Sequence, residues 1–248
     1  MFSKILVATG YWRGYTPNTE IVDLSSNCSA SLPDYPMEVR GTTGQFLNDS
    51  AIICGGEHDD NEGRYSNECY SLEKGANHFE TITPMKAARG YAKSIVTQGK
   101  MWVTGGYEDD DFYGRRLLAS TDFIPKSSFG EPNLPEPIAK HALVSINETT
   151  TMLIGGERIS TYFSPKTHYF NHESLLWTNG PSLMTGRYSH TAGLITDHVT
   201  QEQHVAVVGG WDSQKPVVSE DSVELLLSGE TQWTKGILIF SISNAHHT

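Results

Sequence analysis

Apolar runs that end in a glycine pair recur along the chain at nearly constant spacing. Four such runs span residues 52–56, 102–106, 153–156 and 207–210, and their glycine pairs are Gly55–Gly56, Gly105–Gly106, Gly155–Gly156 and Gly209–Gly210. A fifth run, residues 6–10, keeps only the second glycine, Gly10. The second glycines fall at positions 10, 56, 106, 156 and 210, so the spacings are 46, 50, 50 and 54 residues. The chain is therefore an array of repeats of about 50 residues.

Each repeat carries the same sequence of elements around its glycine pair. A proline turn with a basic residue comes first, and Arg40, Arg89, Lys140 and Arg187 precede the first glycine of the pair by 15, 16, 15 and 22 residues. A second short strand is expected after the pair, at residues 19–24, 68–72, 117–123, 160–163 and 222–227. A fourth strand is expected to end near an aromatic residue, as at Phe79, Trp177 and Trp233.

These short runs of β-branched and aromatic residues, bounded by Gly, Pro, Asn and Asp, predict strands throughout. No window combines a helical period with a cap. Four short strands in about 50 residues make one blade of a β-propeller. The predicted fold class is all-β, with about five four-stranded blades. The glycine pair is expected where neighbouring backbone leaves no room for a side chain, and the large aromatic residues are expected between blades.

Two stretches carry a family resemblance. Residues 177–190, which begin at Trp177 and contain Arg187, together with Gly209–Gly210 resemble a full kelch motif. Arg89 with Gly105–Gly106 is similar. The sequence thus resembles the kelch-repeat family, including the galactose oxidase-like propellers, although the tryptophan is missing from the first three repeats. The resemblance implies a propeller that presents loops on one face to partner peptides.

The whole chain, residues 1–248, is expected to form one propeller domain, with blades at about 1–36, 37–84, 85–137, 138–181 and 182–248. Two interpretations of its last residues stay open. Residues 237–243 pair with residues 4–9 and close a five-bladed ring, which would remove the sheet edges. Alternatively, the chain is a piece of a larger propeller. Loss of the proline and arginine after Trp233 favours the second interpretation.

Composition narrows the range of partners. There are 18 basic and 29 acidic side chains, so the net charge is −11, which disfavours nucleic acid. The hydrophobic content of 38% comes without any apolar run long enough to span a membrane. No signal peptide is visible at the first residues, so the chain is either cytoplasmic or lacks an upstream segment.

The candidate binding residues lie in the loops that follow the glycines, which should emerge on one face. They combine aromatic with charged side chains and are Tyr11, Trp12, Arg13, Asp59, Asp60, Tyr107, Asp109, Asp110 and Trp211. Aromatic residues with a polar rim are typical of recognition surfaces. The acidic residues favour a basic protein or peptide ligand. The alternative is that these are ordinary solvated loops.

No metal, nucleotide or other cofactor is expected. The run from Glu108 to Asp111 lacks the spacing of a calcium loop, and on a strand His168 and His172 would lie about 13 Å apart. No nucleophile elbow or phosphate-binding loop occurs. We therefore expect a protein-interaction module without catalysis. Two alternatives stay open: a carbohydrate-active or oxidase-like propeller enzyme, and a secreted glycan-binding or structural domain.

Cys54 and Cys69 are candidates for a disulfide. Cys54 ends the strand before Gly55, and Cys69 lies in the next strand, so antiparallel pairing would bring their Cα atoms within bridging distance. The sequence also resembles secreted kelch-like proteins of invertebrates, in which a Cys-Gly-Gly segment is followed by a second cysteine. The alternative is two buried free thiols. A bridge would favour an extracellular location, because cytosolic thiols stay reduced.

Overall fold

The computed structural model describes residues 4–11, 14–23, 28–58, 64–111, 114–126, 131–159, 161–212 and 223–236. All regular structure in these ranges is β-strand, and every strand pairing is antiparallel. The predicted all-β class is confirmed. None of the described segments forms a helix of the length and apolarity needed to cross a membrane.

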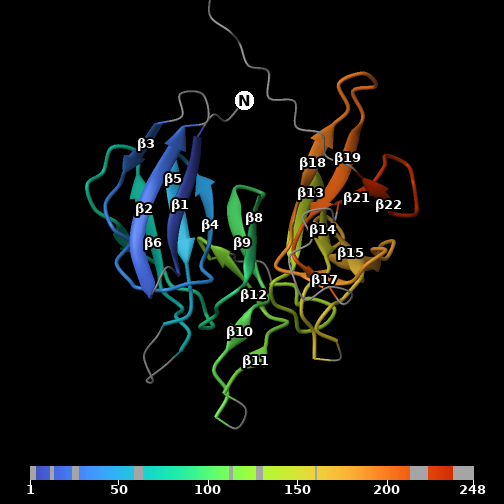
Figure 1. Ribbon diagram of the computed structural model, residues 1–248. Helices are drawn as coiled ribbons and strands as arrows, with labels where there is room; N and C mark the ends of the chain where they lie inside the picture. The colour runs from blue at the N-terminus through green and yellow to red at the C-terminus, as the bar shows by residue number, and fades with distance from the viewer. Residues whose placement is uncertain are drawn as a thin grey trace, which may run out of the picture.

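Five antiparallel sheets follow one another along the chain, and in Figure 1 they stand side by side, from β1–β7 at the left to β18–β22 at the right. The first two sheets, in strand order, are β1 (Lys4–Tyr11), β2 (Tyr15–Asp23), β3 (Cys28–Ser31), and then β4 (Thr43–Leu47), β5 (Ser50–Cys54), β6 (Cys69–Glu73), β7 (Glu80–Ile82). The third sheet is β8 (Lys93–Thr97), β9 (Lys100–Thr104), β12 (Thr121–Ile124).

The last two sheets have four strands each. They are β13 (Ala142–Asn147), β14 (Thr150–Ile154), β15 (Thr167–Asn171), β16 (Leu176–Asn179), and then β18 (Thr191–Thr196), β19 (Gln203–Val208), β21 (Val223–Leu226), β22 (Thr234–Gly236). Two-stranded ribbons extend from the loops and consist of β10 (Tyr107–Glu108) with β11 (Arg116–Leu117), and of β17 (Arg187–Tyr188) with β20 (Trp211–Asp212).

The apolar runs before the glycine pairs are the second strands of their sheets. In β5, β9 and β14 the last four residues are all buried. A strand that is covered on both faces needs a continuous apolar run rather than an alternating one. Hydrophobic side chains from adjacent sheets fill the space between them, as in the cluster of Ile52, Met101 and Val103. The first strands β4, β8, β13 and β18 also contact one another in chain order.

The four glycine pairs occupy equivalent positions. Gly55, Gly105, Gly155 and Gly209 have φ between +61° and +68°, a left-handed conformation that glycine adopts without steric cost. The second glycine ties its sheet to the next repeat: the amide of Gly56 donates to the carbonyl of Arg89 at 2.9 Å. Because a Cβ on Gly55 would lie 2.3 Å from that carbonyl oxygen, a side chain cannot be accommodated.

A chain of backbone hydrogen bonds joins one residue of each repeat to the next. The amide of Tyr91 donates to the carbonyl of Gly41 at 2.7 Å, that of Lys140 to Tyr91 at 3.0 Å, and that of Ser189 to Lys140 at 2.9 Å. All four residues are left-handed, with φ from +54° to +68°. These four positions, which we call the left-handed link, connect the second to fifth sheets through main-chain atoms alone.

The hydrogen bonds of the second glycines correct the expected alignment of the basic residues. The second glycines at 10, 56, 106 and 156 donate to the carbonyls of Val39, Arg89, Ile138 and Arg187, so those four residues are equivalent. Arg40 lies one position later than Arg89 in this alignment, and Lys140 lies two positions later. Only the third and fifth sheets therefore carry an arginine at the motif position. Sequence spacing alone gave a wrong alignment for Arg40 and Lys140, because each lies within two residues of the motif position.

Two predicted strands are also wrong in position. Residues 161–163 form a bridge and a bend, and the third strand of that sheet is β15, which begins at Thr167. The run 117–123 is divided between β11 and β12. The expectation for residues 237–243 lies outside the described residues.

Candidate functional site

Tyrosines from several loops gather at the end of the sheets where the glycine pairs lie. Tyr65 and Tyr107 are buried and stack with ring centroids 6.4 Å apart, and Tyr91 meets Tyr107 edge to face at 5.8 Å. Tyr107 directly follows a glycine pair, Tyr91 belongs to the left-handed link, and Tyr65 pairs with Glu57 across its loop. We call these three residues the tyrosine cluster.

Lysine and arginine side chains lie over these rings. The Lys140 ammonium is 5.3 Å from the ring centroids of Tyr91 and Tyr107 and 4.9 Å from that of Tyr188. Its Nζ also lies 3.1 Å from a carboxylate oxygen of Glu157. Three rings and one carboxylate thus surround a single cation, an arrangement that stabilises positive charge in partly desolvated surroundings.

Carboxylates at the base of the cluster are buried and paired. Glu57 accepts hydrogen bonds from Arg40 Nε at 2.8 Å and from the Tyr91 hydroxyl at 2.7 Å. Burial, with a further contribution from Glu57, raises the pKa of Tyr65 to about 12. Burial and the hydrogen bond to Glu57 likewise raise the pKa of Tyr91. These phenols are therefore neutral near pH 7, and the Tyr91 hydroxyl donates its hydrogen bond to Glu57. The cluster is a packed scaffold beside the surrounding loops.

An exposed apolar patch adjoins this scaffold. Ile159 and Tyr162, in the loop after Gly156, are 80% and 66% exposed, and Trp211, directly after Gly210, is 41% exposed. Tyr188 connects the two loops, because it pairs with Trp211 and stacks on Phe163 at 5.4 Å. We call Ile159, Tyr162 and Trp211 the exposed patch.

The predicted binding residues are placed unequally. Trp12, Arg13, Asp59 and Asp60 lie outside the described residues, and only the backbone of Tyr11, at the end of β1, is described. Tyr107 is buried in the tyrosine cluster instead of projecting to solvent. Asp109 is exposed, and its carboxylate accepts a hydrogen bond from the Tyr65 amide at 3.2 Å. The Asp110 carbonyl accepts from Gly114, and Trp211 is exposed.

Sequence reasoning missed the residues that complete this site. Tyr65, Tyr91, Lys140 and Tyr188 come from different repeats. Tyr162 lies in the run 160–163, which was expected to be a strand, and Ile159 directly precedes that run. One signal was available: Glu57, Tyr107, Glu157 and Trp211 each follow a glycine pair directly. Comparing the residue after the glycine pair across repeats would have indicated the end of the sheets where the tyrosine cluster and the exposed patch lie.

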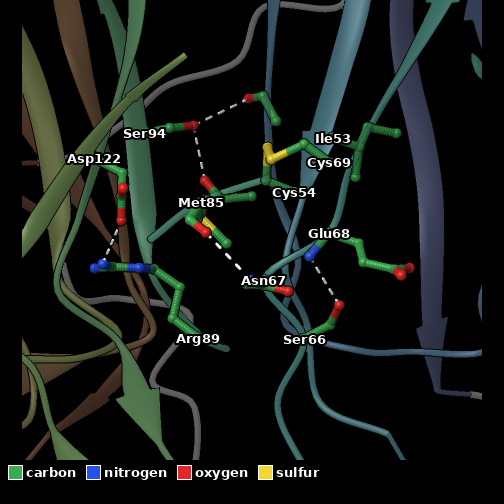
Figure 2. Close-up of a disulfide and its surroundings, with 12 residues drawn as sticks. Ile53, Cys54, Ser66, Asn67, Glu68, Cys69, Met85, Arg89, Ser94 and Asp122 are labelled. Carbon is green, nitrogen blue, oxygen red and sulfur yellow. Dashed lines mark hydrogen bonds and ion pairs between the residues drawn. A yellow bond between two sulfur atoms is a disulfide. The ribbon is translucent and has the colours of Figure 1, made fainter. Parts of the chain in front are cut away.

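Two buried ion pairs hold the motif arginines. Arg89 donates to the Gly105 and Ser120 carbonyls, both at 2.9 Å. It also donates to Asp122 at 2.6 Å (Figure 2). Arg187 repeats the arrangement with the Gly209 carbonyl at 2.9 Å and Glu224 at 2.6 Å. These residues join the turn before the first strand of a sheet to the second and third strands of the same sheet, which is a structural role.

The motif tryptophans also have structural contacts. Trp177 donates its indole N–H to the Asn133 carbonyl at 2.9 Å and packs beside Trp102. Trp233 is buried and donates to the Pro181 carbonyl at 2.8 Å. Each therefore ties an outer strand to the turn that enters its sheet.

The predicted disulfide is confirmed. Cys54 and Cys69 are directly opposed in β5 and β6, their Cα atoms are 4.1 Å apart, and both are fully buried (Figure 2). In Figure 2 the bridge lies between the two strands and near Met85. It closes the base of the loop that carries Glu57 and Tyr65, so it restrains one wall of the tyrosine cluster.

No group of three or more His, Cys, Asp or Glu side chains within the described ranges is arranged to hold a metal ion. A scan against protein-family models finds no match to this chain. A search of curated proteins finds no similar sequence either.

Proposed function

We propose that the protein is a kelch-type β-propeller whose five sheets are its blades, and that it acts as a protein-interaction module. Three features support the propeller: glycine pairs at equivalent positions, innermost strands that contact one another in chain order, and a backbone link from repeat to repeat. In such a fold the loops after the glycine pairs share one face, and loops on a rigid scaffold commonly carry binding functions.

The observation that carries the interaction role is the exposed patch. Tryptophan and tyrosine dominate the binding energy of protein interfaces when they are seated among well-packed neighbours. Tyr162 and Trp211 are exposed beside Tyr188, which is held by Phe163 and Lys140. This patch therefore anchors an apolar side chain of a protein or peptide partner. Asp109 and Asp111, in the loop after Gly106, are exposed and favour basic residues in that partner.

The disulfide supports an extracellular or otherwise oxidising compartment for this activity. A secreted glycan-binding role is the second candidate, because exposed aromatic rings also stack on sugars. In contrast, the buried tyrosines have raised pKa values, so a proton acceptor for catalysis is not favoured at this cluster.

The test uses the full chain immobilised under oxidising conditions, with a secreted-protein fraction and a glycan array as ligands. The double variant Tyr162→Ala/Trp211→Ala removes the patch, and Leu176→Ala is the matched control, since Leu176 is 64% exposed on another part of the surface. We expect one saturable protein ligand that the double variant loses by at least tenfold and the control retains. Equal retention by both variants would refute the proposal, and glycan binding lost only by the double variant would replace the protein ligand with a sugar.

A further inference from the structure

Two asparagines at hairpin turns each begin an Asn-x-Ser/Thr triplet, the acceptor sequence for N-linked glycans. Residues 48–50 (Asn-Asp-Ser) connect β4 to β5, and residues 147–149 (Asn-Glu-Thr) connect β13 to β14. Asn48 and Asn147 are both exposed, as an acceptor on a folded protein must be. A third triplet begins at Asn27, which lies outside the described residues and takes no part in the proposal.

The side-chain nitrogen that would receive a sugar is unoccupied at both turns. At Asn147 the side-chain oxygen accepts hydrogen bonds from the Thr149 amide at 3.0 Å and from the Thr149 hydroxyl at 3.1 Å. Within the described ranges, however, Nδ2 of Asn147 and Nδ2 of Asn48 make no hydrogen bond. In contrast, Nδ2 of Asn67 donates to the Met85 carbonyl at 3.2 Å. The two acceptor nitrogens are therefore accessible without breaking a contact of the fold.

The geometry of the turn does not require the triplet. Asn48 and Asp49 are both left-handed, with φ of +50° and +64°, as in a two-residue hairpin turn. The third sheet makes the equivalent turn with Gln98 and Gly99, at φ of +49° and +69°, and Lys100 follows them. The same backbone is thus formed without an asparagine and without a hydroxyl residue in third place, so turn chemistry leaves the serine of residues 48–50 unexplained.

Both turns lie at the end of the sheets opposite the exposed patch. The strand that follows each turn leads to a glycine pair, as β14 leads from Thr150 to Gly155, and its five residues span about 17 Å. Ile159 and Trp211 come after glycine pairs, at the far end of such strands. In Figure 1 the β8–β9 and β18–β19 hairpins turn at the top of the view, whereas β10 and β11 extend at the bottom.

We propose that Asn48 and Asn147 carry N-linked glycans, so that one end of the sheets is covered by sugar and the end with the exposed patch stays bare. The co-reactant is an oligosaccharide on a lipid pyrophosphate carrier. A bond forms between the asparagine Nδ2 and C1 of the first sugar, the C1–O bond to pyrophosphate breaks, and the amide loses one proton as the lipid pyrophosphate leaves. Glycosylation requires the oxidising compartment proposed above, but it does not depend on the interaction role of the exposed patch.

The covered end limits where a partner can dock. A glycan is bulky and hydrophilic, so it excludes another protein from the surface around its asparagine. With sugars at the turns of the second and fourth sheets, approach from that end is hindered, whereas Tyr162 and Trp211 are left accessible. A protein that uses this surface therefore reaches the loops after the glycine pairs.

The first experiment examines the protein captured by antibody from the tissue that expresses it. A digest without reductant reports the state of Cys54 and Cys69, and peptide N-glycosidase in ¹⁸O-water converts a glycosylated asparagine to a labelled aspartate. We expect bridged cysteines and label at Asn48 and Asn147. Asn77, which is exposed but has no Ser or Thr two residues later, is the matched control and should carry no label.

The second experiment compares variants of the full chain secreted from mammalian cells. By intact mass, Asn48→Gln and Asn147→Gln should each lose one glycan, and Asn77→Gln none. Gln98→Asn with Lys100→Thr builds a triplet at the equivalent turn of the third sheet and should gain one glycan.

A further variant tests which end the sugars cover. Ile159→Asn builds a triplet with Ser160 and Thr161 beside the exposed patch. Its added glycan should lower hydroxyl-radical labelling of Tyr162 at least twofold. Enzymatic removal of the glycans from the parent protein should leave the labelling of Tyr162 and Trp211 unchanged.

The outcomes separate this proposal from the others. Bridged cysteines without label at Asn48 or at Asn147 would overturn the assignment of that residue, while the proposed compartment would stand. Free thiols without label would overturn the compartment and the glycans together. If removing the parent's glycans raised the labelling of Tyr162 as much as removing the glycan added at position 159, the sugars would cover the wrong end and the proposed arrangement would be refuted.

Discussion

The buried pair of Arg89 and Asp122 can be exchanged for a pair that the protein already uses elsewhere. By position, Arg89 corresponds to Ile138. Asp122 corresponds to His168, because Asp122 pairs with Val103 and His168 pairs with Leu153. Val103 and Leu153 each lie two residues before a glycine pair. The same chain thus fills one position with an ion pair in the third sheet and with an apolar residue and a histidine in the fourth.

The magnitude follows from burial. The side chains of Arg89 and Asp122 are only 1% and 3% exposed. Removing one partner leaves the other charge buried without compensation, which costs about 3–5 kcal/mol, whereas replacing both is often close to neutral. We therefore expect Arg89→Ile and Asp122→His each to lower the free energy of unfolding by about 3–5 kcal/mol. The double variant should fall within about 2 kcal/mol of the parent, so the two effects are strongly non-additive.

The assay is urea unfolding at equilibrium, followed by tryptophan fluorescence without reductant. Arg116 and Glu108 form the matched control, because Arg116 Nε and Glu108 Oε1 are 2.6 Å apart but the arginine side chain is 63% exposed. Breaking an exposed pair of this kind should cost less than about 1 kcal/mol. Additive effects at Arg89 and Asp122, or single-variant costs no larger than the control, would refute the reasoning.

Three further predictions concern stability. Gly155→Ala should be more destabilising than Gly209→Ala in urea unfolding. Both glycines have φ above +60°, but only the new Cβ at position 155 would clash with a described atom, His190 Cε1 at 2.7 Å. Equal losses of unfolding free energy would mean that φ alone determines the cost. Reducing the bridge between Cys54 and Cys69, which closes 15 residues, should lower stability by about 3 kcal/mol, as a Tm measured with and without dithiothreitol would show. Burial lowers the pKa of His190 from 6.5 to about 3, so the unfolded chain takes up the proton first as the pH falls. The stability present above pH 6.5 is therefore lost between pH 6.5 and 3, by about 2 kcal/mol at pH 5, and His190→Gln should flatten the dependence of unfolding free energy on pH; an unchanged slope would contradict this.

The parts of the fold that could be predicted are those that only one residue type can satisfy. A left-handed residue such as Gly55, pressed against a neighbouring carbonyl, must be glycine, so the repeat is visible in the sequence. The disulfide followed for a similar reason, because cysteines on consecutive strands of a hairpin are brought opposite each other.

The parts that could not be predicted depend on contacts between repeats. The residue at the motif position contributes the backbone carbonyl that accepts a hydrogen bond from the second glycine. Because this bond does not involve the side chain, valine or isoleucine can stand there in place of arginine, as Val39 and Ile138 show. The tyrosine cluster likewise combines residues separated by more than forty positions, such as Tyr65 and Tyr107. Neither the periodicity of the sequence nor its residue types show which side chains of different repeats come into contact.

The left-handed link has a consequence for how binding specificity can change. Because its hydrogen bonds use main-chain atoms only, the side chains at its four positions are not needed for the connection, and they are as different as glycine at 41, tyrosine at 91, lysine at 140 and serine at 189. Of these side chains, Tyr91 belongs to the tyrosine cluster and Lys140 lies over its rings. Substitutions at positions 91 and 140 can therefore change the chemistry around the tyrosine cluster while the backbone connection between sheets is preserved, which allows one scaffold to bind different ligands.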